Sequence, residues 1–144
     1  MRSLPLLLCF LLALAACGSD DRPEAAITDP ALGWAGPSDL RPRDGTLDRV
    51  EGFRAYVEIV NRDWKNDPEG VAREYLLVGE GDASVDGTTV TILRDRLEDD
   101  SIRAERWVLE LERAGEGWQL VSARWEQRCQ LGRGHQSFGP SLCL

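Results

Sequence analysis

The chain has 144 residues, of which 17 are lysine or arginine and 25 are aspartate or glutamate, so its formal net charge at pH 7 is −8. This length leaves room for one small domain. Because an acidic surface repels nucleic acid and anionic lipid headgroups, the charge argues against nucleic acid as a partner and against a purely electrostatic hold on membranes.

The first residues combine one positive charge with a short apolar run. Arg2 precedes residues 4–16, which are apolar apart from Pro5. The run is shorter than the about 20 residues that a membrane-spanning helix needs, and it is typical of a secretory signal peptide. The sequence therefore predicts that residues 1–16 are a signal peptide.

The end of this run carries a short motif. Leu14, Ala15, Ala16 and Cys17 read LAAC, which resembles the lipobox of bacterial lipoproteins, and polar residues follow it. The resemblance implies cleavage before Cys17 and acylation of its sulfur, for example with palmitate. Two or more acyl chains anchor a protein stably to a membrane. Gly18, where an aspartate would favour the inner membrane, implies an anchor in the outer membrane, facing the periplasm. The alternative is an ordinary signal peptide cut after Ala16.

The cysteines leave a single expected disulfide. Cys9 lies in the signal peptide and Cys17 in the lipobox, which leaves Cys129 and Cys143. Because the cell envelope is an oxidising compartment, these two are expected to pair. Their bond would close a loop of about 15 residues, worth about 3 kcal/mol in the chain-entropy model.

Residues 17–45 are predicted to form a tether. They contain four prolines, several acids and many small residues, a composition typical of a linker. Trp34 stands out in this segment. It either docks on the flank of the domain or contacts a partner.

Two helices are predicted at the start of the folded domain, residues 46–144. Thr46 is the expected N-cap of the first, whose apolar residues recur every three or four positions: Val50, Phe53, Val57, Val60 and Trp64. Asp67 is the expected N-cap of the second, with Pro68 in its first turn. The apolar face of the second helix predicts core packing, although such a stripe can also line a cofactor pocket: Val71, Ala72, Tyr75 and Leu76.

From residue 80 the apolar period becomes two, which indicates strands. Asp86 and Gly87 favour a type I′ hairpin turn, and strands are expected over residues 88–96, 102–112 and 117–128. A calcium loop over residues 82–93 is excluded because its twelfth position, which needs a bidentate carboxylate, is Leu93. The expected inward residues form two sets: Trp107, Leu109 and Leu111, and Val121, Ala123 and Trp125.

These elements predict an α+β fold in which two N-terminal helices pack on one face of a three- to four-stranded antiparallel sheet, followed by a disulfide-closed C-terminal loop. The run GWQLVSARW resembles the closing strand of small NTF2-like or cystatin-like envelope domains. The chain departs from the full NTF2-like pattern because it lacks the third helix before the long strands. The resemblance implies a fold and no particular activity.

The C-terminal loop holds the candidate site. Gly132 and Gly134 allow backbone N–H groups to converge on an anion, and Arg133 and His135 add donors. Arg124 and Arg128, on the strand that leads into the loop, are expected to extend a positive patch. The alternative is that the glycines only make turns, that Phe138 covers the sheet edge, and that Arg133 pairs with an acid.

Catalytic and metal-binding patterns are weak. One histidine and a bonded cysteine pair do not make a zinc site, so we expect no metal and no cofactor. A thiolate–imidazole pair of Cys129 and His135 would need a free thiol. The sequence therefore predicts a membrane-anchored lipoprotein that is not an enzyme and that binds another envelope protein or a small anionic ligand. A small hydrolase or redox enzyme that uses Cys129 and His135 is the alternative.

Overall fold

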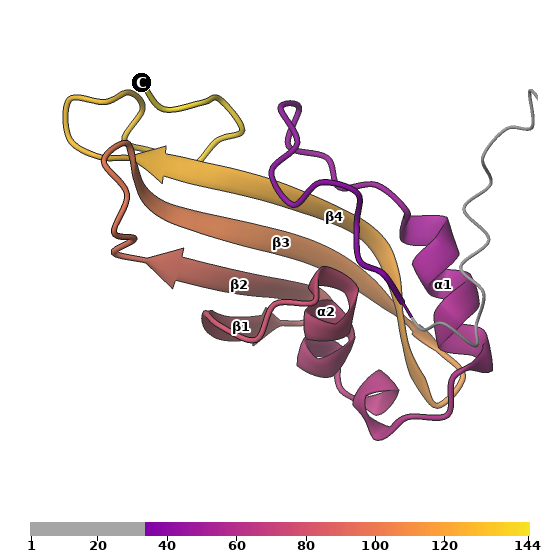
Figure 1. Ribbon diagram of the computed structural model, residues 1–144. Helices are drawn as coiled ribbons and strands as arrows, with labels where there is room; N and C mark the ends of the chain where they lie inside the picture. Colours follow the sequence, from indigo (N-terminus) through magenta and orange to yellow (C-terminus); the bar gives the residue numbers. More distant parts are fainter. Residues whose placement is uncertain (1–33) are drawn as a thin grey trace, which may run out of the picture.

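The computed structural model describes residues 34–144 (Figure 1). The predicted signal peptide, the lipobox with Cys17 and the first part of the tether lie outside the described residues. In the part of the chain that the structure describes, two α-helices and one short 3-10 helix precede four strands: α1 Val50–Ile59, η1 Asp63–Asn66, α2 Pro68–Leu76, β1 Asp82–Asp86, β2 Thr89–Asp95, β3 Ile102–Ala114 and β4 Gly117–Cys129. Within residues 34–144, no helix has the length and apolar character that crossing a membrane requires.

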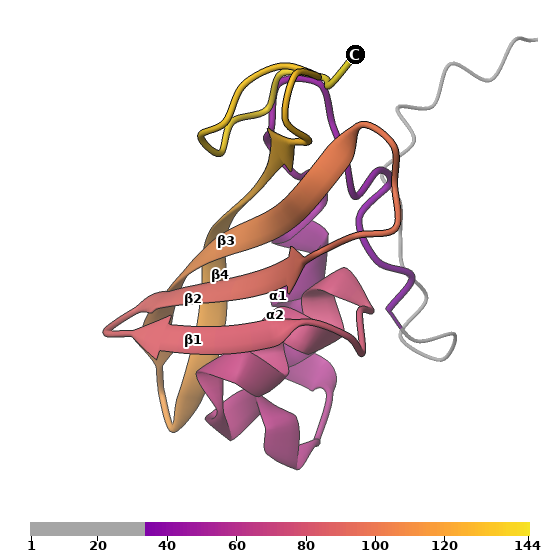
Figure 2. The same cartoon turned by 90° about the vertical axis from the view of Figure 1, so that its left-hand side faces the viewer.

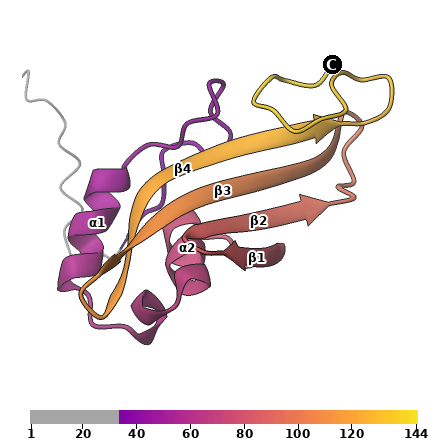
Figure 3. The same ribbon diagram turned by 180° about the vertical axis from the view of Figure 1, so that it is seen from behind.

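The strands form one open antiparallel sheet in the order β1-β2-β3-β4, which confirms the α+β prediction and gives the sheet four strands. The helices lie near the turn that joins β3 to β4, whereas the C-terminal loop lies at the opposite end of these two long strands (Figures 1 and 3). The side view shows the helices on one side of the sheet (Figure 2). Apolar residues of both helices and of strands β2, β3 and β4 form one buried core.

Helix α2 begins as predicted. The Asp67 side chain accepts a hydrogen bond from the Gly70 N–H at 2.9 Å, and Pro68 is the first residue of the helix. This cap satisfies a backbone donor that has no partner within the helix. The four predicted core residues of this helix are all buried: Val71, Ala72, Tyr75 and Leu76.

Helix α1 is shorter at both ends than predicted. It starts at Val50, after Arg49 in the left-handed region (φ 59°), whereas Thr46 pairs with Arg124 of β4 in an isolated β-bridge. The helix ends at Ile59 because Val60 is extended. Trp64 lies in η1, yet its ring stacks 6.2 Å from that of Phe53. The regular apolar spacing therefore extended the predicted helix too far. Trp64 belongs to the short helix η1, which places its ring in the same core.

Residues 34–47 form an N-terminal strap along the domain. Trp34 is only 7% exposed, and its indole N–H donates to the Tyr75 carbonyl at 2.8 Å. Backbone bonds join Leu47 to Ala123 and Trp125 to Gly45 at 3.0 and 2.8 Å. Residues 34–45 therefore pack on the domain and do not form part of a tether, and of the two interpretations of Trp34 the structure shows the docked one.

The hairpin between β1 and β2 turns one residue later than predicted. Asp86 pairs with Thr89, so Gly87 and Thr88 form the two-residue loop. Of these two, only Gly87 has a positive φ, 60°. This pattern of φ signs belongs to a type II′ turn, in which glycine takes the first central position, and not to the predicted type I′ turn.

A β-bulge in β4 changes which side chains face the core. Glu110 pairs with Ser122 and Leu111 with Leu120, so Val121 has no partner in β3. An unpaired residue reverses the alternation of the strand. Val121 is therefore 46% exposed, and the prediction that it shares the buried face of Ala123 and Trp125 is wrong.

Candidate functional site

The tail loop, residues 129–144, is closed by the predicted disulfide. Cys129 and Cys143 are bonded, with their Cα atoms 5.4 Å apart. Backbone hydrogen bonds also hold the loop: Cys129 N–H donates to His135 O at 3.0 Å, and Leu144 N–H donates to Arg133 O at 2.8 Å. Gln127 and Gly139 exchange two further backbone bonds at the edge of β4. The loop is thus fixed by more than its covalent link.

His135 faces the interior of its own loop. Its Nδ1 lies 2.6 Å from the Ser137 carbonyl and its Nε2 lies 2.8 Å from the Ser141 carbonyl. A neutral imidazole has one N–H, so it donates to one of these carbonyls, whereas an imidazolium donates to both. In either form both ring nitrogens lie next to carbonyls of the loop, and the anion clamp of His135 with Arg133 stays a prediction.

The exposed residues of the tail loop include three leucines and one arginine. Leu131, Leu144 and Leu142 are 90%, 84% and 58% exposed. Arg133 is also exposed, and among residues 34–144 no acid lies within ion-pair distance of it. Gly132 and Gly134 have φ values of 81° and 141°, which fits the interpretation of these glycines as turn residues.

Arg128 and Arg124 lie on the outer face of the sheet, opposite the core. Arg128 donates to Asp95 at 3.1 Å, and Arg103 donates to the same oxygen at 3.3 Å. The Arg96 amide and these two guanidiniums hold the pKa of the Asp95 carboxyl below its usual value. Arg124, four residues back along β4, is exposed.

Phe138 covers arginines on this outer face. The Cζ atom of Arg106 lies 4.3 Å from the centre of its ring, and that of Arg128 lies 5.2 Å away. Guanidinium groups at this distance are attracted by the ring electrons. The sheet edge itself pairs with Gly139, the next residue. Phe138 therefore lies over the outer face, whereas the alternative interpretation of the loop had placed it at the sheet edge.

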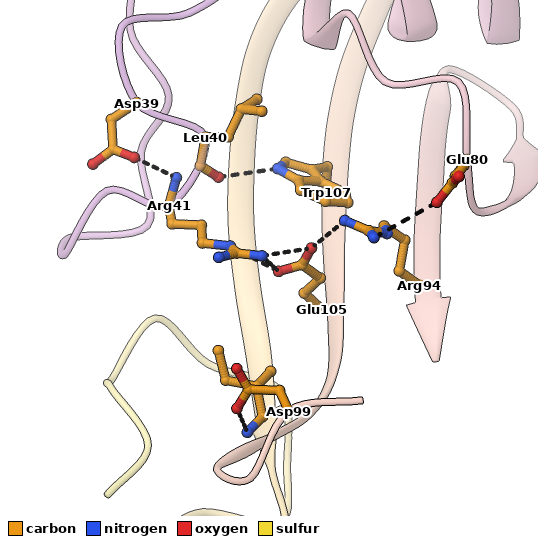
Figure 4. A network of polar contacts seen from close by, with 9 residues as sticks. Asp39, Leu40, Arg41, Glu80, Arg94, Asp99, Glu105 and Trp107 are labelled. Atoms are coloured by element: carbon orange, nitrogen blue, oxygen red, sulfur yellow. Dashed lines mark hydrogen bonds and ion pairs between the residues drawn. The ribbon is translucent and has the colours of Figure 1, made fainter. Parts of the chain in front are cut away.

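A buried carboxylate on the core face escaped the sequence prediction. Glu105 is fully buried, and its carboxylate accepts hydrogen bonds from Arg41 at 2.9 and 3.2 Å and from Arg94 at 3.0 Å (Figure 4). Arg94 and Gln127 are its direct neighbours on β2 and β4. Beside this network, the Trp107 indole donates to the Leu40 carbonyl at 3.1 Å. The helices do not cover this end of the core. The strap covers it instead, through the contacts of Arg41 with Glu105 and of Leu40 with Trp107.

Among the hollows of the described domain, one lies at each end of the long strands. One of about 430 Å³ lies between η1 and the turn joining β3 to β4, and Trp118 lines it. Another of about 320 Å³ lies at the base of the tail loop and is lined by Arg103, Arg128, Cys129, Gln130, Leu131 and Gln136. Of the residues predicted to bind a ligand, only Arg128 lines one of these two hollows, the one at the base of the tail loop.

Together these features define a small α+β domain whose open sheet ends in a disulfide-closed loop that exposes three leucines. No family model, no curated protein and no solved structure matches the chain.

Proposed function

We propose that the protein is a lipid-anchored binding module of the bacterial cell envelope and that its tail loop contacts a protein partner. The observation that carries this proposal is the exposure of Leu131, Leu142 and Leu144 on a loop fixed by a disulfide and by backbone bonds. Several large apolar side chains exposed on one ordered loop favour an interaction site. A fixed loop also loses little conformational entropy when it binds.

The chemistry of the loop defines the partner surface. Arg133 is the cation among these leucines, so the complementary surface is apolar and carries a carboxylate. The lipobox resemblance supports an anchor at Cys17, in the outer membrane and facing the periplasm. Residues 17–33 would then connect the lipid to the strap and place the loop within reach of other envelope proteins.

Site-specific photocrosslinking in cells tests the partner contact. A benzophenone amino acid at Leu131 or Leu144 should yield one and the same adduct. At Ile59, which is 61% exposed on α1 at the other end of the molecule, it should yield none. Arg133→Glu should weaken the adduct at both loop positions. Equal adducts at Ile59 and Leu131, or crosslinks to lipid alone, would refute a protein contact at the loop.

Fatty-acid labelling tests the anchor separately. Growth with an alkyne fatty acid should label the wild-type chain and leave Cys17→Ala unlabelled, because the thiol that accepts the acyl group is gone. Equal labelling of the two chains would show that the lipobox resemblance is misleading.

A small anionic ligand is the second candidate function. The hollow at the base of the tail loop is lined by Arg103 and Arg128, which share the single carboxylate of Asp95 and so keep further N–H donors. Inorganic phosphate should raise the melting temperature of the wild type and of Arg124→Ala but not that of Arg128→Ala. An equal rise in all three chains would indicate a general salt effect and count against this site.

A further inference from the structure

We propose that reduction of the disulfide converts the inside of the tail loop into a site for a thiophilic metal ion, Zn²⁺ or Cu⁺. The two sulfurs of Cys129 and Cys143 and a ring nitrogen of His135 all lie within 4.8 Å of one another. In a tetrahedral zinc site, bonds of about 2.0–2.3 Å place the ligand atoms roughly 3.5–4 Å apart. The three groups therefore need only small shifts to meet one ion.

The loop keeps its shape through contacts that reduction leaves intact. The Cys129 amide donates to His135 O, and the Leu144 amide donates to Arg133 O. The Gln136 side chain donates to Gly134 O at 3.1 Å and to Gln130 O at 3.2 Å. At Gly134 a Cβ atom would lie 2.8 Å from the Cys129 sulfur, so the absence of a side chain lets the backbone pack against that sulfur. The ligands would thus remain close together as thiols.

The surroundings of His135 suit a metal ligand. Each ring nitrogen faces a backbone carbonyl. A histidine that binds a metal through one nitrogen commonly donates its other N–H to such a carbonyl, which fixes the tautomer and the ring orientation. One of the two contacts can therefore persist as this support, while the other nitrogen turns its lone pair to the ion.

The chemistry balances with a dithiol as the reductant. The dithiol gives two electrons and two protons to the disulfide, which becomes two thiols, and is itself oxidised to a disulfide. Metal binding then releases both thiol protons, because thiolate sulfur is the ligand. Two thiolates and one imidazole suit Cu⁺ directly or Zn²⁺ with water as a fourth ligand. The oxidised loop has no thiolate to offer, so binding is gated by redox state.

Metal titration of the purified chain tests the proposal. The full chain with Cys9→Ser and Cys17→Ser, kept in detergent, has thiols only in the tail loop. Treated with a phosphine reductant, it should bind one Co²⁺ with a thiolate-to-cobalt absorption band, and Zn²⁺ should displace that ion. Titration of Cu⁺ against a chromophoric chelator decides between the two metals. The oxidised chain should bind neither.

Variants separate a built site from adventitious thiol binding. Loss of an outer-shell partner costs roughly tenfold or more in metal affinity, so His135→Gln, which removes a ligand, should weaken binding at least tenfold. Cys143→Ser should abolish the cobalt band. Ser137→Ala, which keeps the carbonyl that faces His135, is the matched control and should bind as the parent does. Unchanged affinity in His135→Gln, equal binding by the oxidised chain, or a reduced loop that unfolds and is not restored by metal would each overturn the proposal.

Discussion

Glu105 shows how a charged residue is placed inside a small domain. The carboxylate is fully buried, whereas the side chains of its partners Arg41 and Arg94 are 51% and 33% exposed. A buried carboxylate is tolerated when it is paired and hydrogen-bonded. The two guanidiniums meet this need while their far ends stay in water. Glu105 therefore fastens the strap to the sheet at a place where the apolar core ends.

Glu105→Gln should lower the free energy of unfolding by about 3 kcal/mol. Breaking a buried ion pair costs roughly 3–5 kcal/mol, and the half-exposed arginines favour the lower end of this range. Urea denaturation measures the change. Glu110→Gln is the matched control on the same strand: its carboxylate contacts Thr89 on the outer face, and its loss should cost within about 0.5 kcal/mol. Equal losses for the two variants would contradict the role assigned to Glu105.

Tyr75 should make stability depend on alkaline pH. Burial of the ring, and then the negative charge of Asp48, raise the pKa of its hydroxyl above the usual value near 10. Its stabilising effect is therefore fully present below pH 10 and is lost as the pH rises above that value. The free energy of unfolding should fall by up to about 1.4 kcal/mol per pH unit there.

Urea denaturation between pH 8 and 11 checks this dependence. Tyr75→Phe should show a smaller decline above pH 10 than the wild type, because its ring has no proton to lose. Below pH 9 the two curves should run parallel, with the variant lower by about 1 kcal/mol for the lost hydrogen bond to Asp48 O. Parallel curves over the whole range would show that Tyr75 is not responsible.

At the scale of elements, the bulge in β4 decides which apolar side chains stabilise the sheet. Leu120 is fully buried, whereas its neighbour Val121 faces solvent. Leu120→Ala should therefore cost about 2–5 kcal/mol, and Val121→Thr, which keeps shape and strand propensity, should stay within about 0.5 kcal/mol. Urea denaturation compares them. A cost for Val121→Thr as large as that for Leu120→Ala would mean that the alternation continues without a bulge.

Element types were predictable from the sequence, whereas several boundaries were not. The N-cap at Asp67 involves only residues close to it in the chain, so the local sequence of Asp67 and Pro68 is enough to predict it. The start of α1 depends on the pairing of Thr46 with Arg124, which lie far apart in the chain. The bulge at Val121 likewise depends on the register against β3. Tertiary contacts of this kind override local periodicity and leave no short-range signal.

At the scale of the molecule, the strap completes the core. Trp34→Ala should lower the free energy of unfolding by about 3 kcal/mol, since a buried aromatic ring is lost from a cluster with Phe53 and Tyr75. Thermal or urea denaturation measures this loss. Arg43→Ala, an exposed residue of the same strap, is the control and should be nearly neutral. An equally small effect of Trp34→Ala would place the folded boundary after the strap.

The candidate site was predictable as a location and less so as chemistry. Cysteine counting located the tail loop, because a single pairing, Cys129 with Cys143, remained. It did not reveal that His135 turns inward while three leucines turn outward, since no pattern in so irregular a loop encodes side-chain direction.

The position of Glu105 could have been noticed in the sequence. It precedes Trp107 and Leu109 at intervals of two residues, so the strand pattern predicts that this acid faces the core. Arg41 and Arg94, which both hydrogen-bond its carboxylate, explain why that position tolerates charge.

The pairing of the strap with β4 also limits the order in which parts of the domain can fold. Leu47 and Gly45 form backbone bonds with Ala123 and Trp125, so a segment that is synthesised early pairs with the strand that is synthesised last. Contacts between such distant parts of a chain form slowly. Gly45 and Leu47 must therefore wait, unpaired and accessible to chaperones, until β4 has emerged. Folding of this domain finishes only after synthesis has delivered its last strand.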